Sequence, residues 1–452
     1  MLKLYNTLTR RKERFIPFNG KNVKFFVCGI TTNDYAHIGH AKTYVQFDII
    51  VKYLRYKKYN VFYLQNITDI DDKIINRAKE LKKLPYELAN ECEKSYYEDM
   101  KALKIDSVNK YARATDHINE IVSQVQRLIK LGYAYKIKDG YYFDLSKFPK
   151  YGKLSGRTTL EGEDSVSRID DNKDKKNKGD FCLWKFHKEG EPYWNSPINP
   201  GRPGWHVEDT AITEKYLGQQ YDIHGGARDL IFPHHEAEIA QMESLTKKPL
   251  VKYWMHVGFL NVKSTKMSKS LGNFITIKDA LKKYSPETLR MFFISTHYRS
   301  PIDFSENSLK QAKANLDRIN NFLINIKKSD GKKDIKLLIK KLKKDFIQAM
   351  DDDINTPKAL AVILSFINKV NKLKINKTGA KKTKEFFNEI NKIFYILTQE
   401  EDIPKDIIKL AEERLKARTN KEWNKSDELR NKIKSKGYLV EDTASGYIIK
   451  KI

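Results

Sequence analysis

The segment that decides the fold is Val23–Cys28 (VKFFVC), together with Asn60–Gln65 (NVFYLQ) farther along the chain. Both are short runs of β-branched and aromatic residues, which are typical of buried strands. The intervening residues 37–57 carry apolar side chains at helical spacing, namely Val45, Ile49, Ile50, Tyr53 and Leu54. A strand, a helix and a second strand form a βαβ unit. We therefore predict an α/β fold with a parallel sheet and with ligands at the carboxyl ends of its strands.

A similar pattern follows later in the chain. We predict a helix over 205–217, a strand at Tyr221–His224 and a helix over about 233–245. Between the two halves, Asp164–Lys178 is charged and has almost no apolar residues, which indicates an exposed loop.

From about residue 305 the pattern becomes helical. Segments with helical spacing cover 305–326, 334–350, 356–374, 383–398, 404–418 and 421–436, and their separators are Gly331, Pro357, Gly379 and Pro404. Two later stretches, Tyr438–Val440 and Tyr447–Ile449, could pair as a small β element. We predict a C-terminal α-helical bundle with a small appendage and a domain boundary near residue 305.

Composition limits the class of protein. The 452 residues carry 85 Lys and Arg against 58 Asp and Glu, a net charge of +27. Residues 311–452 hold 33 basic and 20 acidic residues, so about half of the excess lies in less than a third of the chain. This favours a nucleic-acid partner, although solvated lysines from an AT-rich coding bias would give the same excess. No run reaches the roughly 18–20 apolar residues of a membrane span. Because three cysteines do not suggest a disulfide framework, we expect a cytoplasmic protein.

Two short motifs could act on phosphate groups. His37-Ile38-Gly39-His40 begins a predicted helix, whose N-terminus attracts phosphate, and Gly39 would let a nucleotide approach the backbone. Far downstream, Lys266 and Lys269 flank small residues in Lys266–Ser270 (KMSKS) and could neutralise a departing pyrophosphate. Alternatively, the histidines merely cap the helix and the lysines belong to a solvated loop.

Together the two motifs resemble the HIGH and KMSKS signatures of class I aminoacyl-tRNA synthetases. Longer strings are similar to the cysteinyl-tRNA synthetase family and extend over the whole chain. They are Cys28–Thr31 (CGIT), Asn66–Lys73 (NITDIDDK), Gly201–His206 (GRPGWH), Phe232–Glu236 (FPHHE), His297–Pro301 (HYRSP), Asp352–Pro357 (DDINTP) and Lys421–Trp423 (KEW).

The resemblance implies a Rossmann-like catalytic domain over residues 1–304, with an inserted connective region at about 110–200 and the KMSKS loop at about 263–273. A helical tRNA-binding bundle over 305–420 and a small anticodon-recognition element over 421–452 would follow. The implied reaction joins L-cysteine to ATP as cysteinyl-adenylate and then to tRNA(Cys), with Mg²⁺ as counter-ion and the protein acting as a monomer.

The resemblance also implies roles for individual residues. His37 and His40 would stabilise the transferring phosphate, Lys266 and Lys269 the pyrophosphate, and Asp229 the adenosine ribose. The implied cysteine pocket consists of Cys28, Thr68, Trp205 and His206. Trp423 would stack on an anticodon base and Asp427 would read a base edge.

The family selects cysteine over serine with Zn²⁺, which prefers a thiolate to a hydroxyl. The implied ligands are Cys28, position 209, His234 and Glu238. Position 209 is Asp209 where the family has cysteine, so either zinc is retained on a carboxylate or Asp209 partners His234 without metal. The resemblance places Glu238 one helical turn after His234, on the same helix face.

Two rival functions remain open at this stage. One is a cysteine ligase of the same fold that acts on a small amine, which would not need the basic bundle after residue 305. The other is a non-catalytic RNA-binding paralogue, which we would expect to lack one of His37, His40, Lys266 or Lys269.

Overall fold

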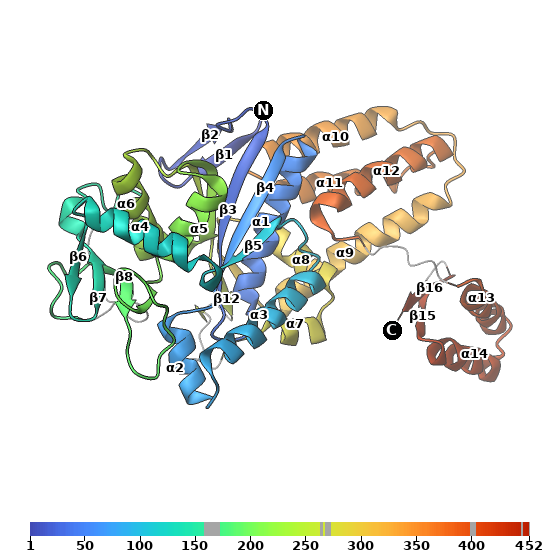
Figure 1. Cartoon of the computed structure of the whole chain (residues 1–452). Coiled ribbons are helices and arrows are strands. Elements are labelled where there is room, and N and C mark those ends of the chain that lie inside the picture. Colours follow the sequence, from blue (N-terminus) through green and yellow to red (C-terminus); the bar gives the residue numbers. More distant parts are fainter. Residues whose placement is uncertain (158–171, 263–264, 267–272, 398–403, 444–445, 452) are drawn as a thin grey trace. The chain divides into compact units, whose positions relative to one another are not determined.

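The computed structural model describes residues 1–157, 172–262, 265–266, 273–397, 404–443 and 446–451 (Figure 1). The chain forms two compact units, Met1–Leu397 and Thr398–Ile452.

The first unit is built on a five-stranded parallel sheet, as the sequence predicts. Its order is β11-β10-β3-β4-β5. The strands are β3 (Asn22–Thr31), β4 (Asn60–Thr68), β5 (Lys110–Arg113), β10 (Tyr221–Ala227) and β11 (Val251–Val257). The strand order reverses between β3 and β10, so this is a Rossmann-like topology whose ligand crevice is expected at the carboxyl ends of these two strands.

Side chains of β3 alternate between two hydrophobic cores, because successive residues of a strand point to opposite faces. Phe25 and Val27 belong to the core on the side of α1 (Ile38–Tyr56) and α8 (Pro286–Ile294). Phe26 and Cys28 belong to the other core, which contains α4 (Ile118–Lys130), α5 (Val207–Leu217) and α6 (Glu236–Thr246) (Figure 1). The alternation therefore directs Cys28 toward α5 and α6.

The stretch between β5 and α5 contains an antiparallel sheet of order β6-β7-β8-β9. Its strands are β6 (Ala134–Ile137), β7 (Gly140–Phe143), β8 (Phe181–Phe186) and β9 (Gly201–Pro203). Most of the predicted exposed loop at 164–178 lies outside the described residues. The buried cysteines Cys92 and Cys182 lie in α3 (Pro85–Ala102) and β8.

Smaller elements complete this part of the unit. They are the hairpin β1 (Lys3–Asn6) and β2 (Arg11–Arg14), α2 (Asp72–Glu80), η1 (Thr115–His117), η2 (Leu145–Lys147), β12 (Leu260–Val262), β13 (Thr265–Lys266), α7 (Ile277–Lys283) and β14 (Ile302–Phe304).

The predicted helices after residue 305 are present as α9 (Glu306–Lys327), α10 (Lys336–Asp351), α11 (Thr356–Val370) and α12 (Lys377–Phe394). The predicted start of α12 at residue 383 is wrong. The Asn376 side chain accepts a hydrogen bond from the Gly379 N–H, so Gly379 lies in the first turn instead of separating two helices. Residues of α9–α12 share one hydrophobic core with α1 and the sheet, and the domain boundary near residue 305 stays a prediction.

Arg290 of α8 joins the helices to the sheet. Its guanidinium forms a fully buried ion pair with Asp48 of α1 at 2.8 Å. It also donates to the carbonyl oxygen of Phe394, the last residue of α12, at 2.6 Å. The end of the bundle is thereby fixed against the helix that follows β3.

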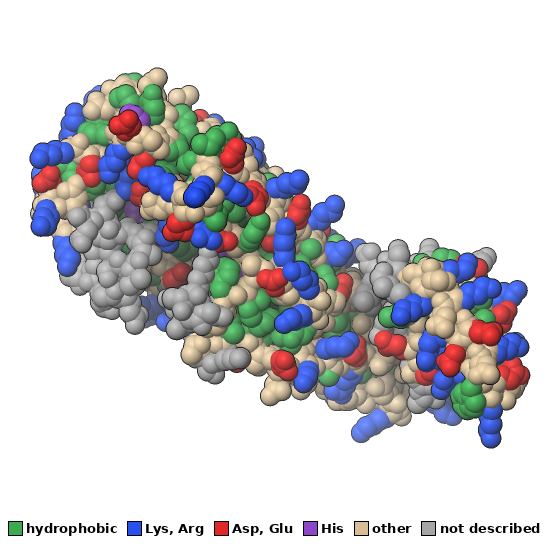
Figure 2. Space-filling view, turned by 90° about the horizontal axis from the view of Figure 1, so that it is seen from below, with side chains coloured by type: hydrophobic (Ala, Val, Ile, Leu, Met, Phe, Trp, Pro, Cys, Tyr) green, Lys and Arg blue, Asp and Glu red, His purple; other side chains and the backbone are tan. Residues whose placement is uncertain are grey.

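The second unit consists of α13 (Lys405–Thr419), α14 (Trp423–Ser435) and the antiparallel pair β15 (Tyr438–Thr443) and β16 (Gly446–Lys451). The pairing of the last two stretches agrees with the sequence prediction. None of the helices in the described parts of the chain is sufficiently long and apolar to cross a membrane. Figure 2 shows Lys and Arg side chains interspersed with Asp and Glu on the visible face, so charge alone does not locate a nucleic-acid surface there.

Candidate active site and metal centre

A cluster of ionisable side chains lies where the strand order reverses. Cys28 comes from β3, Asp209 from α5, His234 from the wide turn η4 (Ile231–His235), and Glu238 from α6. All four are buried, and one ligand atom from each lies within 4.8 Å of the others. The structure thus brings together the four residues that the resemblance implies as metal ligands.

The ligand atoms of this first set lie as close together as neighbouring ligands of one metal ion. His234 Nε2 lies 3.1 Å from Asp209 Oδ2 and 2.8 Å from Glu238 Oε1, and Cys28 Sγ lies 3.8 Å from the same Glu238 oxygen. His234 lies in η4, directly before α6, and the non-helical backbone at Phe232 precedes it. His234 and Glu238, four residues apart, converge as the sequence predicts.

Proton affinities in the cluster reflect burial and mutual repulsion. Burial, followed by the charges of Glu238 and Asp209, raises the pKa of the Cys28 thiol. Burial also raises the pKa of Glu238 to about 8. Burial lowers the pKa of His234, but Glu238 and Asp209 outweigh it, and the net result is about 9. One thiol, one carboxyl and one imidazole whose pKa values are raised at such short range fit a divalent cation, which can take the place of their protons.

Asn66 positions two parts of this centre. Its side-chain oxygen accepts a hydrogen bond from Gly29 N–H at 2.6 Å, and its amide nitrogen donates to Asp209 Oδ1. A Cβ at Gly29 would lie 1.7 Å from the Asn66 carbonyl oxygen, so only glycine fits after Cys28. Sequence reasoning gave Asn66 no individual role, because its partner Asp209 is far away in the chain.

The predicted cysteine-pocket residues contact the same centre. The Trp205 ring stacks on His234 with centroids 4.1 Å apart, and His206 Nδ1 lies 2.8 Å from His234 Nδ1. The Thr68 hydroxyl donates to the buried carboxyl of Glu208, the neighbour of Asp209 in α5.

The HIGH histidines do cap their helix. His37 is the N-cap of α1, and its Nδ1 accepts from Gly39 N–H at 3.1 Å and from His40 N–H at 3.3 Å. The two rings stack with centroids 3.7 Å apart. Burial and the neighbouring His37 lower the pKa of His40. Capping orients both rings at the helix N-terminus, so this structural role is compatible with contact to phosphate.

Backbone hydrogen bonds join the residues after the second motif to the first motif. Ile38 N–H donates to Ile275 O at 3.1 Å, and Ile277 N–H donates to Ala36 O at 2.9 Å. The segment that follows the lysine motif is therefore attached to the start of α1. Lys266 is placed in β13 by its backbone, and Lys269 lies outside the described residues.

Lys42 is a further anchor that sequence reasoning missed. Its ammonium, on α1, donates to the carbonyl oxygens of Gly258, Phe259 and Ser300 at 2.7, 3.0 and 2.8 Å. Gly258 and Phe259 connect β11 to β12, ahead of the lysine motif. Lys42 therefore ties α1, which begins with the first motif, to the connection between β11 and β12.

We expect Lys42→Met to lower the free energy of unfolding by about 1–3 kcal/mol, because three carbonyls lose a charged donor. The KM for ATP should also rise. Denaturant titration and ATP–pyrophosphate exchange measure the two effects. Lys79→Met, at an exposed position of α2, is the control and should change stability by no more than about 0.5 kcal/mol. Wild-type stability in Lys42→Met would contradict the anchoring role.

The remaining predicted residues lie on the surface. Asp229 is exposed in the turn η3 (Arg228–Leu230), directly after β10. In the second unit, the Trp423 side chain is 55% exposed, with the Arg418 guanidinium 5.7 Å from its ring centroid. Asp427 lies one turn later on α14, 3.8 Å from Arg430. Trp423 is not a core residue of its unit.

Comparison with known proteins identifies the class. A family model described as the tRNA synthetases class I (C) catalytic domain matches residues 14–314, and a DALR domain model matches 345–398. The structure is similar to methionyl-tRNA synthetase of Mycobacterium tuberculosis bound by methionyl-adenylate, with a TM-score of 0.63 and 15% identity over 83% of this chain and 92% of that one. The fold is that of a class I tRNA synthetase.

Closer relatives narrow the assignment. The cysteine–tRNA ligase of Thermococcus gammatolerans is 43% identical over 473 residues, covering 100% of this chain and 99% of that protein. The enzyme of that name from Methanococcus maripaludis strain C6 is 46% identical over 475 residues, covering 100% of both chains. The chain belongs to the cysteine–tRNA ligase family.

Proposed function

We propose that the chain activates L-cysteine with ATP and transfers the cysteinyl group to the 3′-terminal ribose of tRNA(Cys). The observation that carries this proposal is the buried cluster of Cys28, Asp209, His234 and Glu238 where the strand order reverses. Full-length similarity to cysteine–tRNA ligases supports it.

In the first step the cysteine carboxylate attacks the α-phosphate of ATP, and pyrophosphate leaves. His37 and His40, at the N-terminus of α1, would stabilise negative charge on the phosphate during transfer. Lys266 and Lys269 would neutralise the departing pyrophosphate, with Mg²⁺ as counter-ion. Asp229 would hold the adenosine ribose. In the second step the terminal ribose of the tRNA accepts the cysteinyl group and AMP leaves.

Cys28, Asp209, His234 and Glu238 would hold Zn²⁺, which would bind the substrate thiolate in preference to a serine hydroxyl. Asp209 can replace the family's cysteine, because carboxylate oxygen also ligates zinc and carries the same formal charge as a thiolate. The hydrogen bond from Asn66 to Asp209 supports this role by fixing the carboxylate. Thr68, Trp205 and His206 would surround the amino acid.

The C-terminal elements support tRNA over a small amine as the acceptor. The helices α9–α12 and the second unit hold most of the basic residues after position 305, and neither element would be needed for a small substrate. We assign the bundle to tRNA binding and the segment from residue 421 to anticodon recognition, with the chain acting as a monomer.

A charging assay tests the proposal. The full chain is incubated with ATP, labelled cysteine and either tRNA(Cys) or a small amine such as glucosamine. We expect label on the tRNA and none on the amine. Transfer to the amine without transfer to tRNA would establish the rival ligase activity, and absence of any adenylate would indicate a non-catalytic paralogue.

Trp423→Ala should weaken tRNA charging and leave ATP–pyrophosphate exchange intact, because stacking on a base contributes roughly 1–3 kcal/mol. The exposed ring makes this substitution mild for folding. Asp427→Asn tests the neighbouring base contact in the same assay. Leu439→Ala, at another exposed apolar position of this unit, is the control. Equal loss of charging and exchange in Trp423→Ala would contradict an anticodon role.

A further inference from the structure

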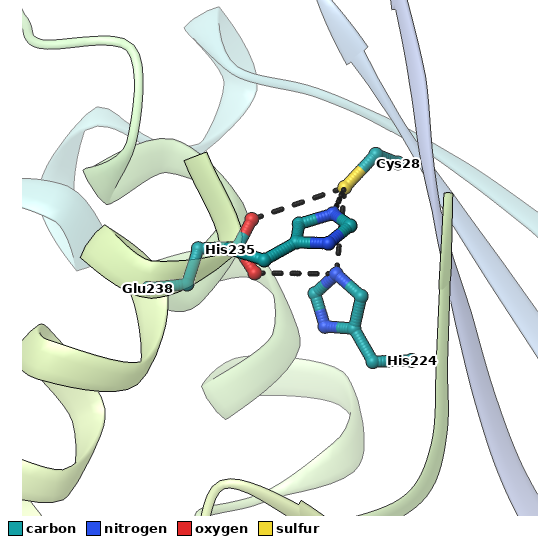
Figure 3. A group of neighbouring side chains, drawn as sticks. All are labelled: Cys28, His224, His235 and Glu238. Atoms are coloured by element: carbon teal, nitrogen blue, oxygen red, sulfur yellow. Dashed lines mark hydrogen bonds and ion pairs between the residues drawn. The ribbon is translucent and has the colours of Figure 1, made fainter. Parts of the chain in front are cut away.

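A second group of ligands adjoins the first and shares two of its residues. Cys28 Sγ lies 3.4 Å from His224 Nε2 and 3.2 Å from His235 Nε2 (Figure 3). His224 Nε2 lies 3.2 Å from Glu238 Oε2. One ligand atom from each of these four buried residues lies within 4.8 Å of the others. The second group therefore consists of one sulfur, two imidazoles and one carboxylate.

Glu238 divides its two oxygens between the groups. Oε1 faces His234 of the first ligand set at 2.8 Å, whereas Oε2 faces His224 of the second. Oε2 is buried, and although His224 Nε2 lies near it, no hydrogen bond reaches this oxygen from the residues that the structure describes. A buried carboxylate oxygen without a donor is costly, and a cation at this point would satisfy it.

In both histidines of the second group, the Nδ1 atom has a hydrogen-bond partner of its own. His224 Nδ1 lies 2.7 Å from the Tyr221 hydroxyl, and His235 Nδ1 lies 2.8 Å from His256 Nε2. The His256 ring in turn meets the Thr7 hydroxyl at 2.8 Å. Such contacts to one ring nitrogen orient the other toward a ligand, as is usual for metal-binding histidines. Here the other nitrogen of each ring faces Cys28.

The backbone also makes room for this arrangement. Gly226 in β10 packs against His235, and a Cβ at this glycine would lie 2.8 Å from His235 Cε1. Any larger residue would displace the ring from Cys28.

We propose that the second group, Cys28, His224, His235 and Glu238, is a second seat for a thiophilic divalent cation such as Zn²⁺. Cys28 and Glu238 would bridge the two ions, with Asp209 and His234 completing the first and the two histidines the second. Zinc bonds of about 2.0–2.3 Å in a tetrahedron separate neighbouring ligands by roughly 3.3–3.6 Å, close to the separations of 3.2–3.4 Å found here.

The two seats share Cys28 and Glu238, so their charges count once. One thiolate and the carboxylates of Glu238 and Asp209 give a formal charge of −3 against +4 for two Zn²⁺, so the centre with two ions would carry a net charge of +1. Bridging carboxylates are usual where two metal ions lie about 3.5–4 Å apart. In the competing arrangement His224 and His235 only donate hydrogen bonds to the Cys28 sulfur, and the centre holds a single ion.

The test counts and locates zinc in the full-length protein. Chelator-treated protein is equilibrated with excess Zn²⁺, freed of loose metal and analysed for zinc per chain. Crystals grown with Zn²⁺ give an anomalous difference map at the zinc edge. We expect two zinc ions per chain and two peaks, one beside Asp209 and one between His224 and His235. One peak, or none, overturns the second seat. This count needs neither a variant nor an activity measurement.

Variants add a matched comparison. His224→Gln should reduce the count from two ions to one and remove the peak beside residue 235. His117→Gln is the control, because His117 is also a buried, hydrogen-bonded histidine but contacts Arg113 and Tyr216 away from the centre. Two ions in His224→Gln would overturn the proposal. The inference rests on the proposed metal centre but not on the proposed reaction, because cysteine-dependent exchange is measured separately.

Discussion

Lys269→Ala should slow cysteine-dependent ATP–pyrophosphate exchange by a factor on the order of 10²–10³, the usual cost of removing one preorganised charge stabiliser. The lysine charge is needed mainly when pyrophosphate leaves, so kcat should fall far more than cysteine binding weakens. Exchange kinetics at varied cysteine concentration separate the two effects.

The control for this variant is Lys282→Ala. Lys282 lies on α7 beyond the motif, and its ammonium is paired with Asp279 on an exposed helix face. Exchange in this control should match the wild type. Lys269→Ala with normal exchange would remove Lys269 from the mechanism.

Cys28→Ser should abolish zinc retention and lower cysteine-dependent exchange by more than about 10²-fold. Loss of a contact that merely orients a ligand already costs about 10–100-fold. Cys28 is the single thiol of the first ligand set and is shared with the second seat. Cys92→Ser and Cys182→Ser are matched controls, because both residues are buried cysteines outside either ligand set. Both controls should keep metal and activity.

Asp209→Cys tests the same centre in the opposite direction. A second thiolate should hold zinc more tightly against a chelator than the carboxylate does, since zinc favours sulfur donors. Wild-type protein that stays metal-free with zinc supplied, yet activates cysteine over serine, would contradict the zinc assignment. Asp209 would then act as the hydrogen-bond partner of His234 that their 3.1 Å separation also permits.

The local sequence pattern is sufficient to predict the strand and the helix that position the site. The β-rich run at Val23–Cys28 and the helical spacing after residue 37 predict β3 and α1 because periodicity is a local property. Alternation along β3 also explains why Cys28 points toward α5 and α6. The start of α12 was missed because one side-chain cap, from Asn376, decided it.

The sequence alone did not predict which side chains meet in the centre, because their proximity depends on pairing between strands that are far apart in the chain. Cys28 and His224 are 196 residues apart, and the parallel pairing of β3 with β10 brings them together. His224 ends the predicted strand but lies in the middle of β10, and a lone histidine in a strand has the same pattern as a core histidine, so sequence alone gave it no role. Asn66 and Lys42 were missed for a similar reason, because their partners are backbone or side-chain atoms from distant elements.

The most direct test of the central claim is amino-acid-dependent exchange of pyrophosphate into ATP, run on the full chain with cysteine, with serine and with no amino acid. Our account predicts rapid exchange with cysteine and rates near background in the other two reactions, because a thiolate-selective site rejects the hydroxyl. Equal exchange with serine, or exchange that requires no amino acid, would contradict it.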